Sequence, residues 1–283
     1  MISVAKADGT NEAFDPNKLV RSLRRAGADE EQAGMIAREV EARLYTGITT
    51  QEIYARAFSL LRRTPEGGGV RRAAAARYSL KRAVLNFGPS GFPFESYIAE
   101  LLRTEGYSAE VDQMVKGACV EHEVDVVAHK DGRTLYVEAK FHNSLGLRSD
   151  LKTALYVQAR VEDLRRGRSE EEAAHMDGIL VTNTKFSEKA VQYAECRGLG
   201  LLSWDYPRGA TLHERIDRAG LYPVTALTSL SKHEKTALLS QRFVLCRALP
   251  HQPEVLTQIG VSGNKADRVL EEVGALCIPG RDI

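Results

Sequence analysis

The sequence has almost no net charge, few cysteines and no long apolar run, and each of these absences limits the kind of protein it can be. Its 283 residues carry 39 Lys and Arg against 38 Asp and Glu, a net charge of +1. Any contact with nucleic acid would therefore depend on local basic patches. No apolar run approaches the roughly 20 residues of a membrane-spanning helix, and Met1–Lys6 lacks a signal-peptide pattern. We expect a cytoplasmic protein with no membrane partner.

Cysteine is too sparse for a disulfide framework or a paired zinc motif. Cys119, Cys196, Cys246 and Cys277 lie far apart, and Cys119 with His122 forms only one half of a zinc-type spacing. Free thiols in a reducing compartment are the favoured interpretation. Apolar content of 43% and charged content of 27% are typical of a globular protein, and the length favours two or three domains.

Turn-forming residues divide the chain into segments 1–87, 92–207 and 211–283, with 88–91 as the clearest linker. The first segment begins with two short strands around Asp8-Gly9, and helices follow. The expected helices begin at Asp15-Pro16, at residue 30 and at Thr49 or Thr50, and a fourth covers 73–85.

The middle segment alternates helices with short apolar strands, which indicates an α/β sheet with helices on its faces. Its expected helices cover 95–106, 149–166 and 187–197, and its strands lie near 124, 135, 178–182 and 200–204. The last segment predicts helices over 212–219, 231–249, 253–260 and 265–276. The fold class we predict is multi-domain α/β, with a small β-hairpin in a mostly helical N-terminal domain and a small helical C-terminal domain.

A predicted hairpin in the middle segment contains the strongest candidates for catalytic residues. Asp131-Gly132 is a strong turn signal between two runs rich in β-branched residues. Side chains two apart in a strand share a face, so Glu138 and Lys140 point the same way. The hairpin brings Asp125 within reach of both. Two carboxylates beside an ammonium make a site for a hard divalent cation and an activated water, the chemistry that cleaves a phosphodiester.

This segment resembles the PD-(D/E)xK nucleases, and in particular the Mrr-type restriction endonucleases. The resemblance runs from Phe94-Glu95 through Glu123-Val124-Asp125 and Val137-Glu138-Ala139-Lys140 to Ile179–Asn183. It implies Mg²⁺ or Mn²⁺ held by Asp125, Glu138 and the Ala139 carbonyl.

The same resemblance implies that Lys140 orients or deprotonates the attacking water. Glu95 would act through a metal-bound water or as an additional ligand.

Ordinary structural roles stay open for several of these residues. Glu138 and Lys140 also fit a solvent-facing strand pair, and Glu95 fits a first-turn acid stabilised by its helix dipole. Gln158 matches loosely a glutamine near the metal in Mrr-like enzymes, but polar filler on a helix explains it as well. His142 and Asn143 could contact a phosphate or equally cap a loop. Phosphate contact or a solvated helix face fits the basic residues Arg148, Lys152, Arg160, Arg165 and Arg166.

The first segment resembles the ATP-cone, a regulatory nucleotide-binding domain. The matching residues include Val4-x-Lys6-x-Asp8-Gly9, Phe14-Asp15, Gly47–Thr50 and Arg77-Tyr78. The resemblance implies ATP or dATP as a regulatory ligand, held by Val4, Lys6, Glu12, Asp15, Lys18, Leu19, Thr50 and Ile53. It departs from the family at Ala7, where a basic residue is common. Gly67-Gly68-Gly69 lacks the G-K-[ST] of a Walker motif, so we expect nucleotide sensing without ATP hydrolysis.

Residues 254–270 are similar to a helix–hairpin–helix, whose turn amides hold a DNA phosphate, and a packing hairpin fits them equally. The combined interpretation is a metal-dependent DNA endonuclease regulated by ATP or dATP, with DNA as its partner and a homodimer as a reasonable arrangement. A non-catalytic nucleotide-sensing DNA-binding regulator is the alternative. RNA or branched DNA as the substrate also stays open.

Overall fold

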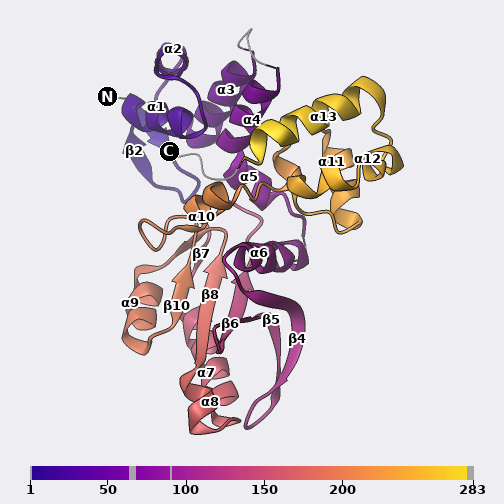
Figure 1. Ribbon diagram of the computed structural model, residues 1–283. Coiled ribbons are helices and arrows are strands. Elements are labelled where there is room, and N and C mark those ends of the chain that lie inside the picture. Colours follow the sequence, from indigo (N-terminus) through magenta and orange to yellow (C-terminus); the bar gives the residue numbers. More distant parts are fainter. Residues whose placement is uncertain (1, 64–67, 90, 279–283) are drawn as a thin grey trace. The chain divides into compact units, whose positions relative to one another are not determined.

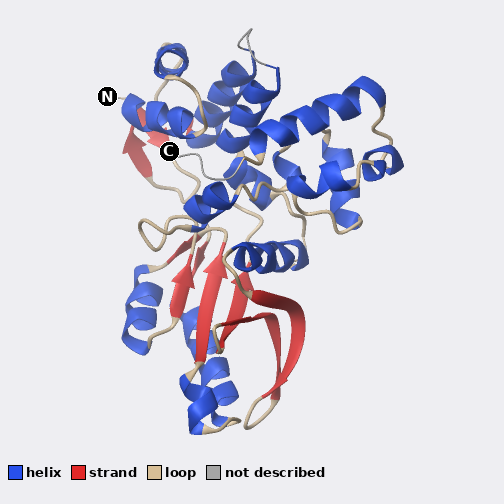
Figure 2. Cartoon of the chain, in the orientation of Figure 1, coloured by secondary structure: helices blue, strands red, loops and turns tan. Residues whose placement is uncertain are grey.

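The computed structural model describes residues 2–63, 68–89 and 91–278, and it contains two compact units (Figures 1 and 2). One unit is Phe87–Ala219, and the other joins Met1–Asn86 to Gly220–Ile283. Helices and sheets occur as the multi-domain α/β prediction requires, so the predicted fold class is confirmed. Within the described ranges, each helix is too short or too polar to cross a membrane.

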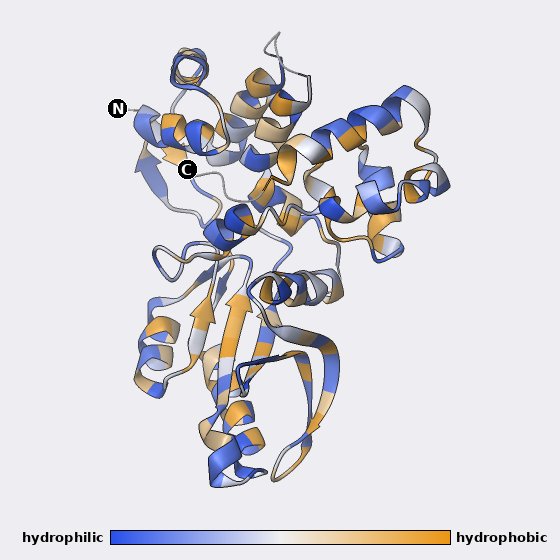
Figure 3. Cartoon of the chain, in the orientation of Figure 1, coloured by the Kyte–Doolittle hydropathy of each residue, from blue (hydrophilic) through white to orange (hydrophobic). Residues whose placement is uncertain are grey.

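The Phe87–Ala219 unit is built on a five-stranded sheet of order β10-β8-β6-β5-β4. Strands β4, β5 and β6 are antiparallel, whereas β6, β8 and β10 are parallel. The strands are β4 (Ser108–Lys116), β5 (Glu121–Lys130), β6 (Arg133–Lys140), β8 (Met176–Thr182) and β10 (Gly200–Leu202). Figure 3 shows apolar residues along β8, consistent with the burial of Leu180 and Val181. A separate parallel pair joins β7 (Arg148–Ser149) to β9 (Lys185–Phe186).

Three helices cover this sheet through apolar faces, namely α6 (Phe92–Thr104), α7 (Leu151–Arg166) and α9 (Glu188–Arg197). The short α8 (Glu170–Ala174) lies against α7, and α10 (Leu212–Ala219) lies against α6. Val157 and Val161 of α7 pack with Leu180 of β8, and Leu164 packs with Tyr136 of β6. Asp150 caps α7 by accepting from the Thr153 amide at 3.1 Å. The sheet therefore holds α7 in a fixed register over β6 and β8.

The predicted turn at Asp131-Gly132 is present, and both residues have positive φ, 50° and 75°. Strand β4 was not predicted, and its sequence explains the omission. Outside the buried Ala109, its residues are half-buried or exposed, and Asp112 adopts a φ of 56°. A strand with so little apolar surface lacks the alternation by which strands are recognised.

In the second unit, the N-terminal part (Met1–Asn86) consists of helices and a three-stranded sheet of order β2-β1-β3. The elements are β1 (Ser3–Ala5), β2 (Asn11–Ala13), α1 (Pro16–Arg25), α2 (Glu30–Glu41), β3 (Ile48–Thr49), α3 (Thr50–Arg63), α4 (Gly68–Tyr78) and α5 (Leu80–Leu85). Asp15 caps α1, as predicted, by accepting from the Asn17 amide. Thr49 rather than Thr50 caps α3, in reciprocal bonds with Glu52. The helix predicted over 73–85 is divided at Ser79 into α4 and α5. Gly68 and Gly69, which were expected to interrupt the helical pattern, begin α4 instead. Gly67 and the linker residue Ser90 lie outside the described residues.

The C-terminal part of this unit is helical, with α11 (Lys232–Ser240), α12 (Glu254–Gln258), α13 (Gly263–Leu276) and two short 3₁₀ turns, Val224–Ala226 and Cys246–His251. The predicted helix 231–249 is wrong beyond Ser240, because the chain turns at Arg242, whose φ is 63°. Helix α13 packs on α4, where the Gly69 amide donates to Glu271 at 2.9 Å. Glu272, fully buried, accepts from the Thr228 and Ser229 amides.

Candidate functional site

Two carboxylates lie near each other where the β5–β6 ladder ends. The last regular pair of the ladder is Val126 with Val137, and Asp125 and Glu138 are the next residues of the two strands. Beyond that last pair the Asp125 carboxylate accepts a hydrogen bond from the Ala139 amide at 2.6 Å, and burial together with the charge of Asp125 raises the pKa of Glu138. Lys140 follows two residues after Glu138 and is exposed. The structure thus brings together the three residues that the sequence placed on one hairpin.

Helix α7 contributes a fourth charged group. Arg160 donates to the Glu138 carboxylate at 2.5 Å, and the two side chains are 12% and 18% exposed. One turn further along α7, Leu164 packs on Tyr136, two residues before Glu138 on the same strand face. The sequence suggested only solvation or phosphate contact for Arg160. Helical spacing from Leu164 is the signal that would have placed it over β6.

Burial sets the electrostatics of the pair. It raises the pKa of Asp125, against the Ala139 amide and the charges of Arg160 and Lys140, which lower it. Burial also raises the pKa of Glu138, and the nearby Asp125 charge adds to the rise. Both carboxylates therefore hold a proton more readily than in water, and a cation between them would relieve their repulsion.

Glu95 lies in the first turn of α6, as predicted, and belongs to the same electrostatic group. Burial, together with the charges of Asp125, Asp112, Glu123 and Glu138, raises the pKa of Glu95 to about 7. The position thus fits both interpretations made from the sequence. It is a first-turn helical acid, and it is also an acid that responds to the charge of Asp125.

The donor set fits a hard divalent cation in its chemistry, because Asp125, Glu138 and the Ala139 carbonyl offer only oxygen atoms. Burial and the neighbouring acids raise the pKa values of Glu95 and Glu138, and burial raises that of Asp125, so a cation bound here would stabilise their charged forms. In the described parts of the chain, no three Asp, Glu, His or Cys side chains are arranged to hold an ion by themselves. A cation would therefore need the backbone carbonyl, water or a substrate phosphate to complete its shell.

Several other sequence candidates have structural roles. The backbone of His142 is bonded on both sides by the Asn183 amide group, at 2.8 and 2.7 Å, which fixes the chain just after Lys140. Burial lowers the pKa of His142. Arg165 donates to the Met176 carbonyl. Gln158 is buried and donates to Glu162, so it is not directed at the carboxylate pair.

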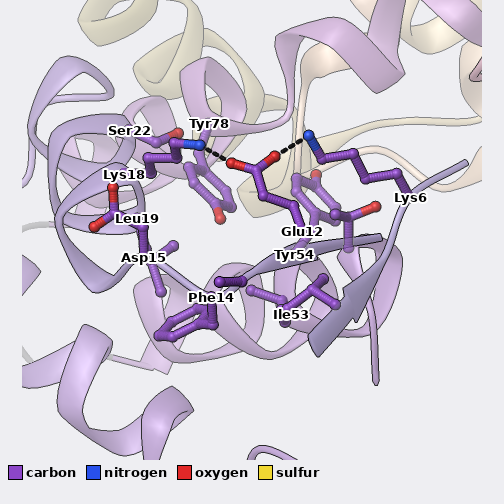
Figure 4. A pocket seen from close by; sticks show the side chains of 13 residues that line it. Lys6, Glu12, Phe14, Asp15, Lys18, Leu19, Ser22, Ile53, Tyr54 and Tyr78 are labelled. Atoms are coloured by element: carbon purple, nitrogen blue, oxygen red, sulfur yellow. Dashed lines mark hydrogen bonds and ion pairs between the residues drawn. The ribbon is translucent and has the colours of Figure 1, made fainter. Parts of the chain in front are cut away.

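A cavity of about 340 Å³ opens in the N-terminal part of the other unit (Figure 4). All eight residues proposed from the sequence line it, namely Val4, Lys6, Glu12, Asp15, Lys18, Leu19, Thr50 and Ile53. Glu12 lies between Lys6 and Lys18 and forms an ion pair with each (Figure 4). Two ammonium groups are thereby held at one side of a largely apolar cavity, where an anionic ligand would compete with Glu12.

The aromatic wall of this cavity was not predicted from the sequence. Tyr54 and Tyr78 stack with their ring centroids 5.1 Å apart and their planes 2° apart, and both line the cavity. The Arg82 guanidinium lies 3.9 Å from the Tyr54 centroid. Burial raises the pKa of Tyr54 to about 12. Tyr78 could have been predicted, because Arg77-Tyr78 is part of the ATP-cone pattern in the sequence. Tyr54 could not, because its place in the cavity depends on how α3 packs on α4.

Comparison with known proteins accounts for each part of the chain. Family models match an ATP cone domain over residues 2–83, an Mrr-type restriction endonuclease domain over 89–206 and an AF1548-like C-terminal domain over 222–277. The two resemblances drawn from the sequence are therefore confirmed. The third match covers the helices that the sequence linked to a helix–hairpin–helix, and DNA binding by them stays a prediction.

Individual relatives cover a large part of the chain. An uncharacterized protein of Archaeoglobus fulgidus is 37% identical over 176 residues, which are 62% of this chain and 97% of the relative. The crystal structure of the protein of unknown function AF1548 is 35% identical with a TM-score of 0.53, over 66% of this chain and 98% of that one. A repair endonuclease from Pyrococcus abyssi is more distant, at 23% identity and a TM-score of 0.32 over 40% of this chain and 46% of that one.

Proposed function

This chain belongs to the AF1548-like family, and we propose that it is a metal-dependent DNA endonuclease regulated by an adenine nucleotide. The proposal joins the two recognised domains, an Mrr-type restriction endonuclease domain and an ATP cone. The observation that carries it is the proximity of Asp125, Glu138 and Lys140 at the end of the β5–β6 ladder, inside the segment that matches the endonuclease model.

Each residue of this group has a part in the proposed reaction. Asp125, Glu138 and the Ala139 carbonyl would hold Mg²⁺ or Mn²⁺, which when bound would supply a Lewis acid and lower the pKa of a coordinated water. Lys140 would orient the attacking water and stabilise the negative charge that develops on the phosphate oxygens. Glu95 extends the negative field that attracts the cation.

Cleavage of plasmid and single-stranded DNA by the pure protein, with and without Mg²⁺ or Mn²⁺, tests the enzyme. We expect cutting that requires the metal, and Asp125→Asn and Lys140→Met should each reduce the rate by about 100-fold or more. Asp177→Asn is the matched control, because this acid lies on β8 of the same sheet and pairs with Arg133 instead. Cutting that survives the first two substitutions would exclude this site.

The cavity of the N-terminal domain supports the regulatory half of the proposal. Lys6 and Lys18 would bind a triphosphate after Glu12 releases them, and the stacked Tyr54 and Tyr78 would contact the base. Calorimetric titration with ATP and dATP should give binding that Lys18→Met weakens about tenfold or more. Arg25→Met, on the same helix but outside the cavity lining, should leave the Kd unchanged. Absence of binding by the unmodified protein would remove nucleotide regulation from the proposal.

A further inference from the structure

Arg160, on helix α7, contacts the carboxylate pair from outside the hairpin. One of its terminal nitrogens donates to Glu138 at 2.5 Å, and the other donates to the Tyr156 hydroxyl at 2.6 Å. Its Nε is buried without a hydrogen-bond partner. The guanidinium is therefore directed at Glu138 although one of its own donors stays unsatisfied, an arrangement that costs free energy.

The position of this guanidinium is fixed by its helix. Val157, Val161 and Leu164 surround Arg160 along α7, and all three are buried in the sheet-facing core. These apolar contacts already hold α7 on β6 and β8. An ion pair is not needed for that purpose, and a buried pair contributes little net stability compared with apolar packing.

The partner of Arg160 is a member of the pair of acids. Glu138 lies just beyond the last regular pair of the β5–β6 ladder, near enough to Asp125 that the charge of Asp125 adds to burial in raising the pKa of Glu138. A guanidinium bound to Glu138 neutralises one of the two charges that would attract a cation. It also restricts the Glu138 carboxylate to one side of the pair.

We infer that Arg160 is a positioning residue of the proposed active site, where it orients Glu138 and competes with the divalent cation for that carboxylate. This inference rests on the proposed function. Arg160 lowers the affinity of the site for the cation and, in return, holds Glu138 in the position that cleavage requires. Loss of its charge therefore tightens metal binding and slows cutting, two effects of opposite sign.

Calorimetric titration of the metal-free full-length protein with MnCl₂, alongside plasmid cleavage, tests this inference. In Arg160→Met, which keeps length and apolar contact, the Kd for Mn²⁺ should fall about tenfold because a like charge is removed, while kcat falls about tenfold or more. Arg160→Lys keeps the charge and should retain a Kd within about threefold of the original. Arg166→Met is the control, since it removes an exposed charge from the same helix.

The outcomes separate positioning from a purely structural role. A structural role would lower the Tm of Arg160→Met and weaken Mn²⁺ binding together with cutting, and that result overturns the inference. An unchanged Kd in a folded Arg160→Met protein overturns it too and leaves the nuclease proposal intact. Failure of every protein to bind Mn²⁺ overturns both. If Arg160→Met does not fold, Arg160→Gln, which keeps a donor without charge, takes its place with the same expected Kd.

Discussion

Among single residues, Glu95 combines the sharpest electrostatic signature with an ordinary place in a helix. A first-turn acid is normally stabilised by its helix dipole, which would lower its pKa. Here burial and the neighbouring acids outweigh the dipole, and the pKa of Glu95 is raised to about 7. In the unfolded chain Glu95 has an ordinary carboxyl pKa near 4.5. Between about pH 4.5 and pH 7, the folded protein therefore keeps a proton on Glu95 that the unfolded chain has already released.

This difference predicts a pH-dependent stability. From about pH 4.5 to about pH 7 the folded state holds more protons than the unfolded state, so the contribution of Glu95 to stability falls as the pH rises. Glu95→Gln removes that loss. In metal-free buffer, the Tm of Glu95→Gln minus that of the unmodified protein should increase from about pH 5 to about pH 8.

The matched control for this measurement is Glu100→Gln, on the same helix, where the side chain pairs with Arg103. A Tm difference for Glu95→Gln that stays constant over the same pH range would contradict the raised pKa. Added Mn²⁺ should reduce the difference at the upper end of the range, because a bound cation compensates the same negative charge.

At the scale of secondary-structure elements, the register of α7 on β8 is set by a glycine. A Cβ added at Gly178 would lie 2.4 Å from a methyl carbon of Val161. Because Val161 directly follows Arg160 on α7, this contact also fixes the distance between α7 and Glu138. Close approach of helix and strand, which only glycine permits here, is thus a condition of the site's geometry.

Gly178→Ala should therefore destabilise the protein by about 1–3 kcal/mol, the usual cost of adding a methyl group to a packed interior. Chemical denaturation measures the change, and DNA cleavage by the folded fraction should fall as well, since α7 must move outward. Gly274→Ala is the control, because outside the adjacent backbone of α13 no described atom lies within 4 Å of the added Cβ. It should be neutral or stabilise the helix. Equal stability of Gly178→Ala and the unmodified protein would refute the close contact.

Local sequence patterns predicted the elements whose own residues determine them. Asp131-Gly132 specifies a hairpin turn, and a two-residue period then places Asp125, Glu138 and Lys140 together. Strand β4 was missed because it depends on pairing with β5 rather than on its own apolar surface. The helix over 231–249 was predicted too long because the apolar spacing continues past the turn at Arg242.

Contacts between elements that are distant in the sequence could not be predicted from these local patterns. The bond from Arg160 to Glu138 spans 22 positions, and its existence depends on which face of α7 meets the sheet. The stacking of Tyr54 on Tyr78 likewise depends on how α3 packs against α4. A single sequence gives the composition of such sites, whereas tertiary packing selects the pairs.

On the scale of the whole molecule, helix α4 connects the nucleotide cavity to the C-terminal helices of its unit. Tyr78, the last residue of α4, lines the cavity. Next to it, Arg77 donates to the Ala275 carbonyl at 2.6 Å, at the end of α13. At the other end of α4, the Gly69 amide bonds to Glu271. A ligand that orders Tyr78 would therefore restrain α13 through the same helix.

Hydrogen exchange of the full chain checks this connection. ATP should slow exchange in α3, in α4 and also in α13, because a bound ligand stabilises every part that opens together with its site. Arg77→Met should retain the protection of α3 and lose most of that of α13, whereas Arg71→Met, on the same helix, should keep both. Equal protection of α13 in the two variants would exclude Arg77 as the link.

The same experiment tests whether the nucleotide governs cutting. If it does, ATP must change the exchange rates of some segment within Phe87–Ala219, because a ligand regulates an activity only by favouring one state of the part that performs it. Protection confined to Met1–Asn86 and Gly220–Ile283, with cleavage rates that do not respond to ATP, would mean that the chain binds a nucleotide and cuts DNA as two independent functions. The proposal that the nucleotide regulates cleavage would then be wrong, whereas the proposed nucleotide site and the proposed nuclease site would both remain.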